Sequence, residues 1–325
     1  MSNASPTITT TRNHVPGPTG LPAITSPGRT GLSVWPVGQR SPAAQRRGRF
    51  VPGSAAHPAR MWPDLAARII AEYSRPGDLV LDPLCGIGTT LVEAVHAGRD
   101  AIGVECEQRW ATLAAANTTL ARSQGGTGQA AVHRGDATAL SEVLPAVLVG
   151  RVDLVVTSPP YGKTMHGRVE HRHGPLQRFH DTYTPDHPTG APRNDTTSPR
   201  SQRTVNLARR NRLGLTEGIT AVLAGCVPFL KPGGLVVVTV RPWRRGGYLV
   251  DLPGAVHTAA MAAGLRPVER CVALLAAVHD DHLLPRHSFF QLVHTRRARS
   301  TGLPVHLLSH EEVLVYERCQ RGELP

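Results

Sequence analysis

Cysteine and long apolar runs are the two most informative shortages in this sequence. The five cysteines stand at positions 85, 106, 226, 271 and 319, and this spacing predicts neither a zinc site nor a disulfide framework. No apolar run approaches the roughly 20 residues that a membrane-spanning helix needs, and the first residues lack the apolar core of a signal peptide. These shortages argue against disulfide-rich secreted and membrane-embedded classes and favour a reduced, cytoplasmic protein.

Acidic and aromatic residues are also scarce. The 24 Asp and Glu residues face 36 Lys and Arg residues, and the resulting net charge of +12 favours a polyanionic partner such as nucleic acid. Phe, Trp and Tyr make up 4% of the chain, so stacking on a base would rest on a few residues such as Tyr161 and Trp243.

The first 55 residues are rich in Pro, Ser, Thr and Gly, and no acidic residue precedes Asp64. This composition predicts a largely disordered basic arm over residues 1–55. Four arginines of the arm could contact phosphate, although a merely solvated tail is an equal alternative; they are Arg40, Arg46, Arg47 and Arg49.

A strand, a glycine turn and a helix follow one another within residues 78–95. The apolar strand ends at Asp82 and Pro83, and Gly86 and Gly88 allow tight turns and a close backbone approach to a ligand. Thr89 or Thr90 is predicted to cap the helix, whose free N–H groups favour polar or anionic ligand groups. The third glycine of the dinucleotide fingerprint is missing, which lowers the case for NAD or FAD.

Acidic side chains stand at the ends of the next two predicted strands. Glu105 ends the strand that starts at residue 100, about 20 residues past the glycine turn, where a carboxylate suits two ribose hydroxyls. Asp136 follows the apolar residues 130–132 and could accept a hydrogen bond from an adenine amino group.

The sequence Thr157-Ser158-Pro159-Pro160-Tyr161 follows the apolar residues 152–156, which read as a buried parallel strand. Ligands collect at the carboxyl ends of such strands. Two prolines in succession stiffen the loop and leave its carbonyls unpaired. A hydroxyl, rigid carbonyls and an aromatic ring suit the amino group of a flat heterocycle; a proline-rich turn with a core tyrosine is the alternative.

Together, residues 82–90 and 157–161 resemble the motifs of the amino-methyltransferases that methylate N4 of cytosine or N6 of adenine in DNA with S-adenosyl-L-methionine (SAM). The resemblance extends over roughly residues 57–297. It implies a class I SAM-dependent methyltransferase: a Rossmann-like α/β sheet, mostly parallel, with an antiparallel final hairpin. Ser-Pro-Pro-Tyr accompanies N4-cytosine more often than N6-adenine in that family, so cytosine is favoured.

The resemblance also implies roles for individual residues. Ser158, Pro159, Pro160 and Tyr161 would form the catalytic loop that holds the target base. The cofactor would be held by His57, Asp82, Pro83, Cys85, Gly86, Gly88, Thr89, Thr90, Glu105 and Asp136. Cys85 is interpreted as a small residue that fills the glycine turn rather than as a nucleophile, and no metal is expected.

The predicted methyltransferase domain covers residues 56–300 and is followed by a tail over 301–325. A basic insert over 162–215 follows the catalytic loop and is favoured as a nucleic-acid contact over an inert loop. Helices are expected near 219–229 and 255–263 and a strand over 235–240. The final strand pair is expected over 267–278 and 288–296, with a further short strand over 310–317.

Three readings remain open. DNA is favoured as the substrate, and strict restriction-type specificity is in doubt because only the short insert could recognise a target sequence. An RNA base N-methyltransferase acting on tRNA or rRNA is the nearest alternative, although such enzymes normally carry an N-terminal RNA-binding domain. A basic nucleic-acid-binding protein with an inactive SAM fold is the third.

Overall fold

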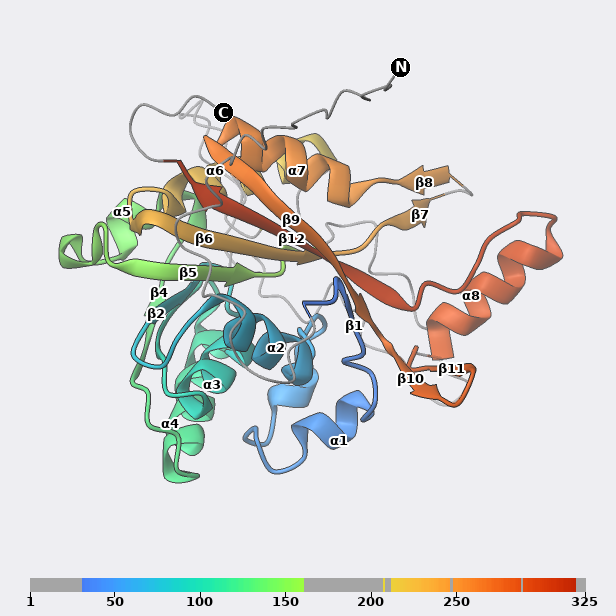
Figure 1. Cartoon of the computed structure of the whole chain (residues 1–325), viewed down its shortest axis with the longest axis horizontal. Coiled ribbons are helices and arrows are strands. Elements are labelled where there is room, and N and C mark those ends of the chain that lie inside the picture. Colours follow the sequence, from blue (N-terminus) through green and yellow to red (C-terminus); the bar gives the residue numbers. More distant parts are fainter. Residues whose placement is uncertain (1–30, 161–206, 208–211, 246–247, 288, 320–325) are drawn as a thin grey trace, which may run out of the picture.

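An eight-stranded sheet forms the centre of the molecule, in the order β1-β9-β12-β6-β5-β2-β3-β4 (Figure 1). The computed structural model describes residues 31–160, 207, 212–245, 248–287 and 289–319. The strands of this sheet are β1 Val34–Trp35, β2 Leu79–Asp82, β3 Asp100–Glu105, β4 Ala130–Arg134, β5 Val152–Thr157, β6 Leu230–Val240, β9 Leu265–Leu274 and β12 His310–Arg318. Two small hairpins stand apart, formed by β7 Trp243–Arg245 with β8 Tyr248–Val250 and by β10 Ala276–His279 with β11 His282–Pro285.

The strands β2 to β6 are parallel to one another. Side chains of β5 and β6 are buried on both faces, which explains why both strands read as continuous apolar runs. Because parallel strands point the same way, their carboxyl ends meet at one edge of the sheet. This edge is where the sequence analysis expects the site.

Helices cover both faces of the sheet (Figure 1). One face packs against α2 Pro63–Tyr73, α3 Thr89–His96 and α4 Gln108–Ser123, and the other against α5 Leu140–Val143, α6 Arg212–Cys226 and α7 Leu252–Ala262. The remaining helical elements are α1 Pro42–Arg46, α8 Phe289–Ser300, and the short 3₁₀ turns η1 Ser54–Ala56, η2 Ala137–Ala139 and η3 Ala146–Leu148. Within the part of the chain that the structure describes, no helix is both long and apolar enough to cross a membrane.

The antiparallel closure of the sheet is confirmed, but its predicted residues are wrong. Residues 288–296 were expected to pair with 267–278, whereas Phe289–Ser300 form α8. The true partner of β9 is β12, which lies between β9 and β6 and is antiparallel to both. Phe and Val residues around 289–293 favour a strand locally, and the tertiary context overrides that preference. The strand β11 lies between the two segments that were expected to pair.

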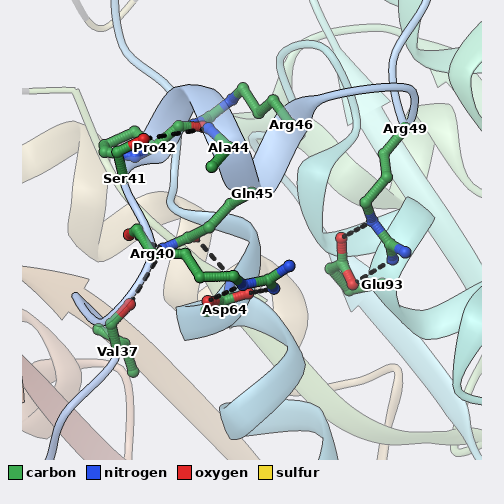
Figure 2. A network of polar contacts seen from close by, with 10 residues as sticks. All are labelled: Val37, Arg40, Ser41, Pro42, Ala44, Gln45, Arg46, Arg49, Asp64 and Glu93. Atoms are coloured by element: carbon green, nitrogen blue, oxygen red, sulfur yellow. Dashed lines mark hydrogen bonds and ion pairs between the residues drawn. The ribbon is translucent and has the colours of Figure 1, made fainter.

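Residues 31–55 are folded, in contrast to the predicted disordered arm. Val34 and Trp35 pair in parallel with β9, and the Trp35 ring is buried in the core. The fully buried Gln45 side chain of α1 donates to the carbonyls of Val37 and Arg40 and accepts from the Asp64 amide (Figure 2). Long-range contacts therefore order a segment whose local composition predicts disorder.

Three of the four arginines expected to contact phosphate form hydrogen bonds within the molecule. Arg40 pairs with Asp64 at the start of α2, and Arg49 forms a two-pronged bond with Glu93 of α3 (Figure 2). Arg46 donates to the Met61 carbonyl. Of the basic insert over 162–215, Leu207 and the start of α6 are described and the rest lies outside the described residues, so its predicted nucleic-acid contact stays a prediction.

Candidate active site

A cavity of about 1820 Å³ opens at the carboxyl edge of the parallel strands. It brings together twelve of the fourteen predicted site residues, from five separate stretches of sequence. Those that line it are His57, Asp82, Pro83, Cys85, Gly86, Thr89, Thr90, Glu105, Asp136, Ser158, Pro159 and Pro160. Gly88 does not line the cavity, and Tyr161 lies outside the described residues.

Both predicted glycines of the turn have a positive φ, 54° at Gly86 and 79° at Gly88. A Cβ at Gly86 would also stand 3.1 Å from Nε2 of His57, so a side chain at this position would crowd the histidine. Because the residue is glycine, the backbone itself faces the cavity. The predicted threonine cap is wrong: Gly88 occupies the N-cap of α3 without a side-chain bond. The Thr90 hydroxyl instead donates to Asp82, with 2.6 Å between the oxygens.

Glu105 at the end of β3 faces the glycine turn. One carboxylate oxygen accepts the Gly86 amide at 3.0 Å and the other accepts the Glu107 amide at 2.8 Å. Burial raises the pKa of this carboxyl, although the two amides act in the opposite direction. A carboxylate has about four lone-pair positions, so acceptor capacity remains on Glu105 for hydroxyl groups of a ligand.

Asp136 caps the turn η2 after β4. Its Oδ1 accepts both the amide and the hydroxyl of Thr138. The side chain is thereby fixed at the cavity wall. Its position at the third strand end agrees with the prediction, and its capping role is one that the sequence analysis did not anticipate.

Ser158, Pro159 and Pro160 continue directly from β5 into the cavity. Ser158 is half-buried and Pro159 is buried, so the serine is reachable from the cavity while the proline is wedged against the protein. The preceding Thr157 is almost fully buried. The loop therefore meets the glycine turn across the ends of the adjacent strands β2 and β5.

Comparisons with known proteins agree with this geometry. Residues 25–116 match the model of a family described as DNA methylase. Over 107 residues the chain is 36% identical to the tRNA (guanine(10)-N2)-dimethyltransferase of Methanocaldococcus jannaschii. The aligned segment covers 33% of this chain and 30% of that protein. Over 50 residues it is 48% identical to the Type II methyltransferase M.MthZI of Methanothermobacter thermautotrophicus. This second segment covers 15% of this chain and 14% of that protein.

The match to the DNA methylase family extends over residues 25–116. The matched residues span β1 to the first part of α4 and include the glycine turn and Glu105, but not Ser158. The aligned segments cover less than a third of either curated relative. Among solved structures, TrmN from Thermus thermophilus aligns with a TM-score of 0.45 at 18% identity and covers 84% of this chain and 52% of that one.

The cofactor of this methylase family is SAM, and the described residues suit it. The bare backbone at Gly86 forms a cradle that a Cβ would fill, and carboxylates stand at the two strand ends beside it. These donors and acceptors match a ligand with an amino-acid end, ribose hydroxyls and an adenine ring.

His57 lies beside the glycine turn, and Cys85 is part of it. The His57 ring packs edge-on against Trp110, with 4.8 Å between the ring centroids, and its Nδ1 accepts the Ala59 amide. Burial lowers the pKa of His57 to about 4, so the ring is neutral near pH 7. Burial raises the pKa of the Cys85 thiol well above its usual value, which agrees with a packing role.

Asn117 is a residue of this site that the sequence analysis missed. It is fully buried in α4, where its amide group donates to the Ile87 carbonyl within the glycine turn at 2.9 Å. Its carbonyl oxygen accepts the Val51 amide at 2.7 Å. A signal was present, because a buried asparagine inside a helix needs partners outside the helix.

Proposed function

We propose that this protein is a SAM-dependent methyltransferase that modifies an exocyclic amino group of a DNA base, with N4 of cytosine favoured over N6 of adenine. One observation carries the proposal: the Ser158-Pro159-Pro160 loop and the glycine turn with Glu105 line the same cavity. The first element suits the amino group of a base and the second suits the methyl donor.

An exocyclic amine is a weak nucleophile because its lone pair is delocalised into the ring. SAM supplies an activated methyl group when bound, so the protein chiefly has to position and polarise the amine. In our proposal, the Ser158 hydroxyl and the Pro159 carbonyl accept the two amine hydrogens. This arrangement aims the lone pair away from the loop and stabilises the positive charge that develops on nitrogen. Tyr161 would stack on the base, and a base in a duplex would have to leave the stack first.

The cofactor side of the proposal assigns three regions of the cavity. The glycine turn, supported by Asn117 and His57, would hold the methionine part; Glu105 would hold the ribose hydroxyls and Asp136 the adenine amino group. The bonds that Glu105 and Asp136 already make fix each carboxylate, so little side-chain entropy is lost when the ligand binds.

Methylation of an RNA base is the second candidate. It is favoured by the relative named as a tRNA (guanine(10)-N2)-dimethyltransferase, which matches a longer segment than the Type II enzyme does. The guanine N2 group is also an exocyclic amine, so the same loop chemistry would apply.

The deciding experiment measures transfer of radiolabelled methyl from SAM to duplex DNA, single-stranded DNA and total RNA, followed by mass spectrometry of the nucleosides. N4-methylcytosine or N6-methyladenine in DNA supports the proposal. Label only in RNA moves the protein to the second candidate, and SAM binding without any transfer contradicts both.

Two variants separate the halves of the proposed site. Ser158→Ala is expected to lower turnover about 10²-fold while leaving SAM affinity unchanged, because it removes an acceptor that acts on the developing charge. Ser123→Ala, at an exposed serine that ends α4, is the matched control. Equal turnover of both variants would remove Ser158 from the reaction.

Gly86→Ala is expected to weaken SAM binding at least about tenfold, because the new Cβ requires a strained φ and crowds the cradle beside His57. Gly150→Ala imposes a similar strain, with a φ of 68°, where no atom lies within 4 Å of the added Cβ. It should therefore lower stability only. Isothermal titration with SAM checks both, and equal affinities would contradict the placement of the cofactor at the turn.

A further inference from the structure

An insertion between two strands of the sheet flanks the cavity, in addition to the catalytic loop. Residues 275–309 form an insertion between β9 and β12 that contains the β10–β11 hairpin and α8. Since β6 and β9 are both antiparallel to β12, they run in the same direction. The end of β9 therefore lies at the same sheet edge as the ends of the parallel strands, and the insertion projects beside the site (Figure 1).

The insertion is anchored to the body of the protein. The Arg286 guanidinium donates to the carbonyls of Gly38 and Gln39 in the N-terminal segment. A Cβ at Gly38 would collide with the backbone of Ala276, so the segment and the start of β10 are in close backbone contact. These contacts fix the β10–β11 hairpin, which precedes α8 in the chain, to the N-terminal segment.

The two sides of α8 have different surroundings. Gln291, Thr295 and Ala298 follow the i, i+4, i+7 spacing of one helix face and line the cavity. Val293, Arg296 and Arg297 follow the i, i+3, i+4 spacing of another face and are exposed. The helix is thus one wall of the cavity with a basic outer side.

In the described part of the chain, no neighbouring carboxylate compensates the charge of this outer side. The sequence of α8 holds three arginines and no acid. Arg266 and Arg270 of β9 pair with Glu317 and Glu312. Among the described residues, by contrast, no carboxylate lies within ion-pair distance of Arg296 or Arg297.

We propose that α8 is a nucleic-acid contact surface, in which Arg296 and Arg297 bind phosphates of duplex DNA while the helix face with Gln291 and Thr295 borders the base that enters the cavity. The proposal rests on the proposed function for the identity of the polymer. A row of exposed cations beside a pocket for a base fits the negative charge of a backbone whose base is presented there. The insertion would supply a substrate-contacting region apart from residues 162–215.

The test measures binding of the full chain to a duplex DNA oligonucleotide by fluorescence anisotropy over a series of salt concentrations. The Arg296→Gln/Arg297→Gln double variant is expected to lower the slope of log K against log salt by about 1.8, or 0.9 for each lost phosphate contact. The Arg296→Lys/Arg297→Lys variant should keep the wild-type slope. The matched control is Arg75→Gln/Arg151→Gln, because both arginines are exposed and precede strands at the opposite sheet edge.

A second measurement does not depend on charge. A benzophenone amino acid in place of Val293, which is 41% exposed on the outer side of α8, is expected to crosslink to the DNA. The same group in place of Val147, which is 67% exposed in η3, should not. An unchanged salt slope or crosslinking no stronger at 293 than at 147 would overturn the proposal.

The outcome is separable from that of the proposed function. If the wild-type protein transfers no methyl group to DNA but the salt slope still falls in the glutamine variant, the contact surface stands and the proposed reaction fails. If DNA is methylated and the slope is unchanged, the reaction stands and the contact surface fails. The same titration with duplex RNA identifies the polymer, and an effect confined to RNA would overturn the assignment to DNA.

Discussion

Asp82 is an almost fully buried carboxylic acid at the end of β2. The Thr90 hydroxyl and the Leu84 amide donate to it, yet burial has the larger effect and raises its pKa from 3.8 to about 6. The side chain thus couples the glycine turn to α3 through a bond whose strength changes near neutral pH. Its protonation is accordingly linked to folding.

This linkage predicts a pH dependence. Between about pH 4 and pH 6 the folded protein retains a proton on Asp82 that the unfolded chain has lost, so stability falls as pH rises and then levels off above the folded pKa. Relative to Asp82→Asn, the wild-type protein should lose on the order of 3 kcal/mol of unfolding free energy across this range. Urea unfolding of both proteins at several pH values checks this, and parallel curves would contradict it.

For individual residues, the sequence predicts which positions belong to the site better than it predicts their hydrogen-bond partners. Gly86 and Gly88 could be found because only glycine accepts their backbone angles at little cost, and that requirement is local. The hydrogen-bond partner of Thr90 could not be predicted, because a threonine after a glycine turn can cap the helix or turn toward a buried carboxylate. The position of Asp82 at the end of β2 decides between these two roles. The role of Asn117 likewise depends on partners that lie far away in the sequence.

The element with the largest difference between expectation and structure is the segment from β1 to η1. Its two-residue strand and five-residue helix are too short to persist alone, so pattern and composition suggest disorder. Contacts with β9, α2, α3 and α4 hold it in place instead. Disorder inferred from composition fails wherever a distant element supplies the missing partners.

Gln45→Ala tests this arrangement. Removing the side chain leaves two carbonyls and the Asp64 amide without their partner, which should cost about 1–3 kcal/mol of unfolding free energy. Gln108→Ala, at an exposed glutamine in the first turn of α4, should change stability by less than about 0.5 kcal/mol. Urea unfolding compares them. Equal stability of the two variants would mean that the segment is only loosely attached.

The elements of the parallel half were predictable because each consists of an apolar run closed by a glycine, a proline or an acidic residue. The identity of the hairpin partner was not, since both 288–296 and 310–317 carry apolar residues that fit a strand. Only the pairing of β12 with β6 and β9 together selects the second.

At the scale of the whole molecule, β12 joins the two parts of the sheet. It is the sole bridge within the main sheet between β6 and the pair formed by β9 and β1. A chain that ends at residue 303 should therefore fail to fold cooperatively, whereas one that ends at Cys319 should unfold like the full-length protein. Near-ultraviolet circular dichroism and urea unfolding report the difference. A cooperative transition in the shorter chain would show that the parallel half folds independently.

The place of β12 also has a consequence for biosynthesis. β1 is the first strand described in the chain, and its partner β9 reaches the rest of the sheet through a strand near the other end. As the polypeptide leaves the ribosome, every residue of the glycine turn emerges long before the sheet can close around it. An incomplete translation product would carry the whole cofactor cradle on an open sheet edge, which makes it a target for chaperones and proteases rather than a partly active enzyme.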